Sequence, residues 1–312
     1  MSACVSPMLA RVGALVLMAL GLVVPVVAEP VNSPARIAII IDDVGYNLAL
    51  GRRAAELPGA YTLALLPMTP HTRELAELGR ERGKELMLHA PMANERGLPL
   101  GPGALELSMT RAELLQSLRA SLASLPEVVG VNNHMGSALT AQPQPMGWVM
   151  SELVRRDLFF VDSRTTAASV AERVGRDYGL KTARRDVFLD HERSPAHIQQ
   201  QLERALLLAQ RRGWAVAIGH PHPETLAVLE RAAPLMAEQA VQLVSASALV
   251  QRARFGAGYC PLAPDSLRDY RPPAGQMPPL IVSVRWWNWK SLINWSYQPA
   301  AKLEKHGISN SG

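Results

Sequence analysis

Cysteine is nearly absent from this chain of 312 residues, which contains only Cys4 and Cys260. Cys4 lies in an N-terminal segment that we expect to be removed, so the mature chain could not form an internal disulfide. Aromatic residues make up only 5% of the sequence, and three of the six tryptophans lie together at 286–289. Because 48% of the residues are hydrophobic, stability is expected to come from the packing of a sizeable core.

Long runs of like charge are also missing. The net charge is +5 and the isoelectric point is about 9.5, but the excess comes from scattered arginines. A nucleic-acid partner would require a basic stripe or a recognisable binding motif, and the sequence has neither. The sequence therefore predicts no nucleic-acid partner, although its charge is compatible with a weak attraction to an anionic cell-envelope surface.

The longest apolar run, 12–27, follows Arg11 and is shorter than the ~20 residues of a membrane-spanning helix. It ends in small residues up to Ala28, as a signal peptide does before its cleavage site. We therefore predict a signal peptide at 1–28 and a polar linker at 29–35. The protein is expected to be exported, to the periplasm or the cell exterior. The alternative is an uncleaved membrane anchor.

Short apolar runs alternate with segments of helical period. The runs expected to be strands are 36–41, 61–66, 85–88, 128–131, 158–161, 186–189, 215–218 and 241–244. The segments expected to be helices are 73–82, 110–125, 147–156, 194–212 and 223–238. Thr110 with Glu113 fits a capping box, and Pro195 after Ser194 fits a first helical position.

This alternation predicts a parallel sheet of the α/β class. We favour a distorted (β/α) barrel of seven or so strands over residues 36–254, with an open doubly wound sheet as the alternative. After 254 the pattern gives way to glycine, proline, serine and tryptophan without a clear period. Residues 255–312 are therefore expected to be a poorly structured C-terminal extension, and contact with a membrane interface is one reading of its tryptophans.

In a parallel sheet or barrel, catalytic groups gather at the carboxyl ends of the strands. Asp42 and Asp43 follow the first predicted strand, His89 the third and His134 the fourth. One such histidine alone is more often structural, and an Asp pair alone can cap a turn. Together, one of these two carboxylates with His89 and His134 predicts a divalent metal site with an open position, in which the other carboxylate is left free as a base.

Other polar residues also follow predicted strands. Asp162 and Arg164 follow the fifth, and they are read equally well as a pair that orients the site or as an ordinary salt bridge. His220 and His222 follow the seventh, where one of them could act as a general acid. We prefer His220, because it comes directly after the strand.

Two further residues complete the candidate site. His71 follows the second predicted strand and could line a substrate groove, although a solvated loop position is the simpler interpretation. Asn133 directly precedes His134 and is placed with the residues that surround the metal ligands.

These motifs resemble the polysaccharide deacetylase (NodB-like, carbohydrate esterase) superfamily over roughly residues 36–250. Asp42–Asp43 resembles its Asp-Asp motif, in which the first acid is the catalytic base and the second a metal ligand. Leu88–His89 stands where the first metal histidine lies. The segment 160–164 and the Ile-Gly-His motif ending at His220 occupy the places of later motifs, the last of which carries the general-acid histidine.

The chain departs from the ordinary family in its second metal histidine. The family takes both histidines from one His-x-x-x-His segment, whereas alanine follows His89 at that spacing. His134 is the substitute. The motifs Asp-Asp-Val-Gly, Leu-His-x-Pro-Met and Asn-Asn-His-Met-Gly-Ser occur together in the divergent branch of the family, and this chain resembles that branch in all three.

The resemblance implies a NodB-like barrel and a metal-dependent hydrolase that deacetylates an acetylated glycan or peptidoglycan-like polymer. Asp42 would remove a proton from water and His220 would protonate the departing amine. Two imidazoles and one carboxylate favour Zn²⁺. Two alternatives stay open: a metal-dependent hydrolase of another ester or amide, and an envelope protein that binds metal and glycan without turnover.

Overall fold

The computed structural model describes residues 34–250. The predicted signal peptide, most of the linker and the C-terminal extension lie outside this range. The strands are β1 Ala35–Val44, β2 Thr62–Leu65, β3 Glu85–Met92, β4 Gly130–Met135, β5 Phe159–Asp162, β6 Thr182–Arg184, β7 Val187–Phe188, β8 Trp214–Gly219 and β9 Val241–Leu243. The helices are α1 Leu48–Ala55, α2 Thr72–Glu81, α3 Arg111–Ser124, α4 Pro143–Arg155, α5 Ala171–Asp177, α6 Pro195–Arg212, α7 Pro223–Leu229, α8 Ala232–Glu238 and α9 Ala246–Val250, with a 3₁₀ turn η1 at Leu139–Ala141.

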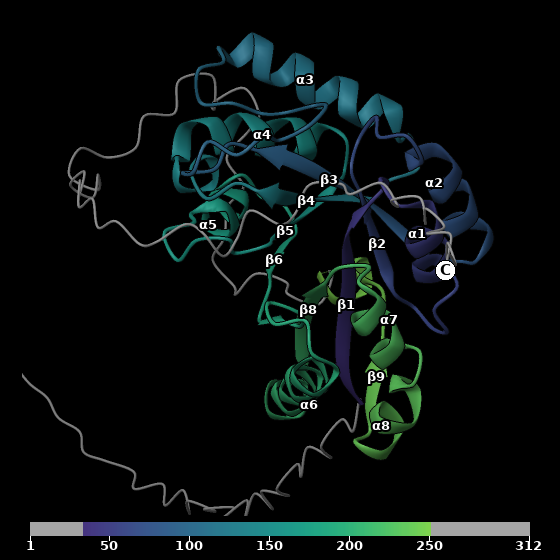
Figure 1. The fold of residues 1–312 in the computed structure, drawn as a ribbon. Coiled ribbons are helices and arrows are strands. Elements are labelled where there is room, and N and C mark those ends of the chain that lie inside the picture. Colours follow the sequence, from purple (N-terminus) through teal and green to yellow (C-terminus); the bar gives the residue numbers. More distant parts are fainter. Residues whose placement is uncertain (1–33, 251–312) are drawn as a thin grey trace, which may run out of the picture. The chain divides into compact units, whose positions relative to one another are not determined.

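All strand pairs are parallel, in the order β6-β5-β4-β3-β2-β1-β8-β7. Strand β9 pairs with the first residues of β1, on the same side of β1 as β2, which pairs with its later residues. The sheet curls as a half-barrel with helices around it (Figure 1), and no pairing closes it between β6 and β7 among residues 34–250. The prediction of an α/β barrel is confirmed, because neighbouring strands follow chain order instead of winding outward from a switch point.

Alternation along the strands divides the core into two faces. In β1, Ile37, Ile39 and Ile41 belong to the larger cluster, which is shared with the helices, while Ala38 and Ile40 belong to a smaller cluster. The smaller cluster also takes Met87, Phe159, Val161, Val216 and Ile218 from the other strands, and α9 packs against it. It therefore forms the apolar inner layer of the half-barrel.

The capping predictions hold in the structure. Thr110 and Glu113 form a reciprocal capping box at the start of α3, and Pro195 occupies the first turn of α6 behind the cap Ser194. The helix expected at 223–238 is broken into α7 and α8. Pro234 explains the break, because a continuous helix would bring its ring against the carbonyl of Glu230, whereas the first turn of α8 accepts a proline.

Five elements were not predicted: α1, α5, α9, β6 and the 3₁₀ turn η1. Helices α1, α5 and α9 have eight, seven and five residues, and β6 and η1 have three each. Such short elements show too few periods of an apolar pattern to stand out. The side chain of Asn47 caps α1, since it accepts a hydrogen bond from the Leu50 N–H at 3.0 Å. None of the described helices is long and apolar enough to cross a membrane.

An ion-pair cluster joins α3 to α4. Glu152 is buried, and it accepts hydrogen bonds from Arg119 at 2.9 and 3.0 Å, from Arg156 at 2.9 Å and from Arg155. Although burial raises the pKa of a carboxyl group, these arginines lower the pKa of Glu152 to about 2. The carboxylate therefore contributes to stability at neutral pH.

Replacing Glu152 by glutamine is expected to lower the free energy of unfolding by about 1–3 kcal/mol at neutral pH, since the half-exposed arginines are screened by water. Because the folded pKa lies below the ordinary 4.5, this contribution is present above pH 4.5 and lost as the pH falls towards 2. Urea unfolding of both proteins at neutral pH and near pH ~4 measures the difference. Glu127→Gln, which breaks the exposed pair with Arg80, is the matched control and should cost less than ~0.5 kcal/mol. A Glu152→Gln effect that grows in acid would contradict the assignment.

Candidate metal centre

A layer of polar side chains covers the apolar inner layer at the carboxyl ends of the strands. Alternation along β1 places Asp42 on the same face as Ala38 and Ile40, and alternation along β3 places His89 with Met87. On β4, Asn132 and His134 share one face, and His220 continues the face of Val216 and Ile218 beyond β8. The inner face therefore changes from apolar to polar within one or two residues.

Asp43 is the exception to this alternation. A regular strand would turn its side chain to the outer face, away from Asp42. The pairing of β1 with β2 shifts register between Ile41 and Val44, and Asp43 has a left-handed backbone with φ of 57°. Gly45 follows with φ of 147°, and a Cβ there would lie 2.2 Å from Thr69 Oγ1. This irregular strand end brings both carboxylates to the same side, whereas successive side chains of a regular strand point to opposite faces.

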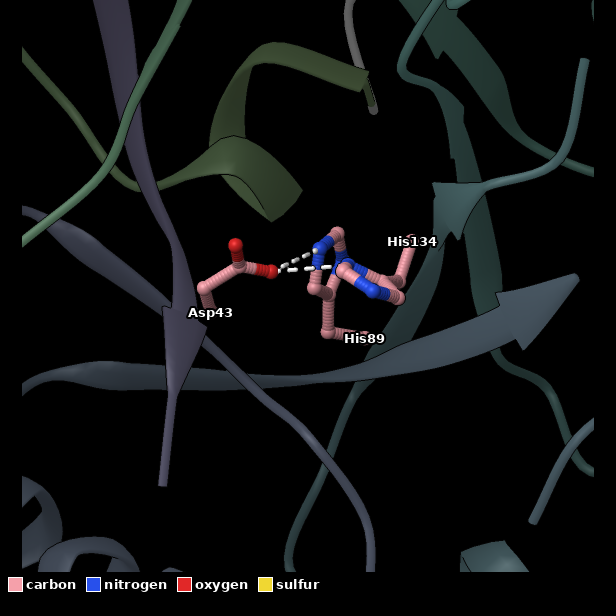
Figure 2. Close-up of side chains that lie close together, drawn as sticks. All are labelled: Asp43, His89 and His134. Atoms are coloured by element: carbon pink, nitrogen blue, oxygen red, sulfur yellow. Dashed lines mark ion pairs between the residues drawn. The ribbon is translucent and has the colours of Figure 1, made fainter. Parts of the chain in front are cut away.

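Three ligand atoms converge at Asp43. Its Oδ1 lies 2.8 Å from His134 Nδ1 and 3.1 Å from His89 Nε2 (Figure 2), and the two rings meet edge to face. Two ligands at ~2.0–2.2 Å from one ion stand roughly 3–3.5 Å apart, so the observed spacing suits a shared cation. Asp43 Oδ1 is buried and has no partner of hydrogen-bond geometry among the described residues. The arrangement of the three ligand atoms therefore suits the coordination of a divalent metal better than it suits hydrogen bonds between Asp43 and the two histidines.

The electrostatics support a cation at this point. Although burial raises the pKa of a carboxyl group, the imidazoles of His134 and His89 hold the pKa of Asp43 well below its ordinary value. Burial is also the main effect on Asp42, and it raises the pKa of that carboxyl group. Asp43 and His134 are partly open to solvent while Asp42 and His89 are almost fully covered, so one side of the centre can receive water or substrate.

Asp42 lies beside the three ligands and is not one of them. Its Oδ2 is 3.6 Å from His89 Nε2, and its Oδ1 accepts a hydrogen bond from Asn132 Nδ2 at 2.7 Å. Asn132 Oδ1 lies 2.8 Å from His89 Nδ1. The candidate base and a candidate ligand are thus held by the same buried amide.

His220 lies beside the second carboxylate oxygen of Asp43, with Nε2 at 3.8 Å from Asp43 Oδ2. Its Nδ1 is 3.0 Å from the buried Asp190, which also accepts the His220 N–H at 2.6 Å and the Thr225 hydroxyl at 2.8 Å. Although burial lowers the pKa of a histidine, the bond to Asp190 and the charges of the neighbouring aspartates raise the pKa of His220 to about 9. The ring is therefore protonated at neutral pH and can donate a proton from Nε2.

Asp190, His220 and His222 form a second group of potential metal ligands. Both Asp190 oxygens already accept hydrogen bonds. Asp190 is therefore better suited to orient His220 than to bind a metal. The His222 ring stacks on His220 with centroids 5.5 Å apart, and burial lowers its pKa. Of the two histidines, the structure turns His220 towards Asp43.

Asn133, Asp162 and Arg164 organise the loop after β5. Asn133 points away from the metal ligands, accepts the Ser163 N–H at 2.9 Å and donates to the Met135 carbonyl at 2.6 Å. Asp162 accepts the Arg164 N–H at 2.8 Å and the Ser169 hydroxyl at 2.7 Å. The Asp162 carboxylate thus binds the backbone of Arg164, whose guanidinium donates to the carbonyls of Ser169 and Ala167 instead.

His71 lies at the start of α2, outside both histidine groups. Its backbone N–H donates to the carbonyl of Gly45 at 3.0 Å, so the residue ties the loop after β2 to the loop after β1.

Sequence reasoning missed Asn132 and Arg185. Alternation along a strand would have placed Asn132 on the face of His134, whereas we chose the adjacent Asn133. Arg185 donates to the carbonyls of Ser163 and Arg164 at 2.7 and 2.8 Å, and its charge acts on Asp42. It lies between two short strands, β6 and β7, where the strand-end argument gave no signal.

The family model for divergent polysaccharide deacetylases matches residues 39–250. The chain belongs to this family. The matched segment begins within β1, continues to the end of α9 and includes each candidate site residue, so the site described above lies in the part of the chain that defines the family.

Two bacterial proteins share the sequence closely enough to align most of the barrel. The uncharacterised protein YibQ of Escherichia coli is 36% identical over 236 residues, which cover 75% of this chain and 74% of that protein. An uncharacterised protein of Haemophilus influenzae is 36% identical over 196 residues, covering 63% of this chain and 70% of the relative. A crystal structure of an uncharacterised protein from Agrobacterium tumefaciens has the same fold, with a TM-score of 0.67 at 23% identity over 71% of this chain and 91% of the other.

Proposed function

We propose that this protein is a metal-dependent hydrolase that removes acetyl groups from an N-acetylated or O-acetylated polysaccharide of the cell envelope. One observation carries the proposal: Asp43, His89 and His134 converge on one point, the buried Asp42 lies beside His89, and the Asp190-held His220 lies beside Asp43. Membership of the divergent polysaccharide deacetylase family supports the reaction class.

Asp43, His89 and His134 would hold the metal, and the donor set of one carboxylate and two imidazoles favours Zn²⁺. A bound divalent ion supplies a Lewis acid, which makes water a better nucleophile and stabilises negative charge on the substrate carbonyl oxygen. Asp42 takes the proton of the attacking water. Its raised pKa makes it a stronger base than an exposed carboxylate.

The leaving group is the sugar amine of an N-acetylated unit or the hydroxyl of an O-acetylated one. Expulsion of either requires a proton, and protonated His220 supplies it from Nε2. Asp190 keeps Nδ1 bonded, so that Nε2 is the nitrogen that faces Asp43 and the substrate side. Asp42, beside His89, would thus remove a proton, and His220, beside Asp43, would donate one.

Acetate release tests the proposal. The full chain, loaded with zinc, is assayed on acetylated chitooligosaccharide and on peptidoglycan fragments, beside protein stripped by a chelator. We expect zinc-dependent release of acetate. Asp42→Asn should retain zinc and lose turnover by about 10²–10⁴-fold, because this variant removes the base and keeps the ligands.

A fully zinc-loaded protein that releases no acetate from any of these substrates would reject the deacetylase. Glycan binding by the same sample would then favour a role in binding metal and glycan without turnover. Release of another acyl group or hydrolysis of another ester or amide would keep the hydrolase and change its substrate.

A further inference from the structure

Asn132 is fully buried between the candidate base and a candidate metal ligand. Its Nδ2 donates to Asp42 Oδ1 at 2.7 Å and lies 3.3 Å from Ser163 Oγ, while its Oδ1 lies 2.8 Å from His89 Nδ1. One amide group therefore contacts both halves of the site. No sequence motif that we used assigns it a role.

The direction of these bonds follows from what each atom can do. An ionised Asp42 can only accept, so the amide nitrogen of Asn132 must face it. The amide oxygen then faces His89 Nδ1, and this ring nitrogen must carry the hydrogen. The lone pair of His89 is thereby placed on Nε2, which is the atom at 3.1 Å from Asp43 Oδ1. The reversed amide would leave the hydrogen on Nε2, where it would exclude a cation.

We propose that Asn132 is a positioning residue that sets the tautomer of His89 and the orientation of Asp42, and so couples metal affinity to the placement of the base. The part of this proposal that concerns the His89 tautomer, the His89 half, depends only on the metal site. The part that concerns the orientation of Asp42, the Asp42 half, rests on the proposed function. Residues that accept a hydrogen bond from the second ring nitrogen of a metal-binding histidine typically raise the metal affinity 10–100-fold.

Two substitutions separate the halves. Asn132→Asp keeps an oxygen that can accept the His89 Nδ1–H, but it loses the donor to Asp42. Asn132→Leu has a similar size and supports neither neighbour. The control is Thr62→Val, which removes a buried hydroxyl at the amino end of β2 whose two hydrogen bonds are to Glu85 and to the Ala246 N–H.

Zinc affinity is measured by competition with a chromophoric chelator, and folding is checked by thermal unfolding of each variant. We expect Asn132→Leu to bind zinc about 10–100-fold more weakly, while Asn132→Asp and Thr62→Val stay within about fivefold of the parent. In ¹⁵N-histidine spectra of the zinc-loaded protein, the His89 Nδ1–H signal should be present in the parent and in Asn132→Asp. In acetate release, Asn132→Asp should lower kcat at least tenfold at a nearly unchanged KM.

Unchanged zinc affinity in a folded Asn132→Leu variant would overturn the His89 half. So would a His89 ring in the parent that carries its hydrogen on Nε2. Full turnover of Asn132→Asp would overturn the Asp42 half. If the parent protein releases no acetate, the proposed function fails, and the zinc and ¹⁵N measurements still decide the role of Asn132 towards His89.

Discussion

Replacing His134 by alanine is expected to lower the zinc affinity of the protein by more than about 100-fold. The substitution removes one of three ligand atoms, Nδ1 at 2.8 Å from Asp43 Oδ1, and water is a weaker ligand than imidazole. Loss of a direct ligand should lower the zinc affinity by more than the 10–100-fold that is lost with a residue hydrogen-bonded to a ligand. Competition with a chromophoric chelator gives the dissociation constants of parent and variant.

His71→Ala is the matched control, because His71 also follows a strand of the same sheet and lies outside both histidine groups. Its zinc affinity should stay within a few-fold of the parent. A zinc affinity of His134→Ala that equals that of the parent would mean that His134 does not bind the metal. Equal losses would mean that the metal is bound elsewhere or that His71 is part of its site.

Replacing Asp190 by asparagine is expected to lower kcat for acetate release by about 10²–10⁴-fold while zinc affinity stays within a few-fold. Asparagine has nearly the same shape, but it removes the negative charge that keeps His220 protonated and can present an amide N–H to Nδ1. The ring would then lose its preferred tautomer and its proton. Steady-state rates at saturating substrate, with zinc content measured on the same samples, test the prediction.

The control for Asp190 is Asp186. Both carboxylates hold a backbone N–H of the β8 segment: Asp190 binds that of His220 at 2.6 Å, and Asp186 that of Val216 at 2.9 Å. Asp186→Asn should therefore disturb the backbone in a similar way and leave kcat nearly unchanged. A comparable loss in both variants would show that Asp190 supports the strand and does not act on His220.

Much of the site follows from the alternation of side chains along parallel strands. Asp42, His89, His134 and His220 all continue the inner face that begins with apolar residues such as Ile40 and Met87. Short apolar runs were enough to place these strands, and parallel strands bring their carboxyl ends together. The same rule would have identified Asn132.

The remaining features depend on departures from regular structure. Asp43 reaches the site only through the register shift and left-handed backbone at the end of β1, which no apolar pattern encodes. Arg185 acts from a short connection between β6 and β7. The pairing of Asp190 with His220 required knowledge that β7 lies beside β8, a long-range contact set by packing of the whole sheet.

Asp43, His89 and His134 together are expected to bind one divalent metal. X-ray absorption at the zinc edge, on the full chain loaded with one equivalent of Zn²⁺, tests this ligand set most directly. We expect a first shell of nitrogen and oxygen at about 2.0–2.2 Å, with outer-shell scattering from two imidazoles that falls to one imidazole in His134→Ala. A sulfur scatterer at about 2.3 Å, or a spectrum that His134→Ala leaves unchanged, would contradict it.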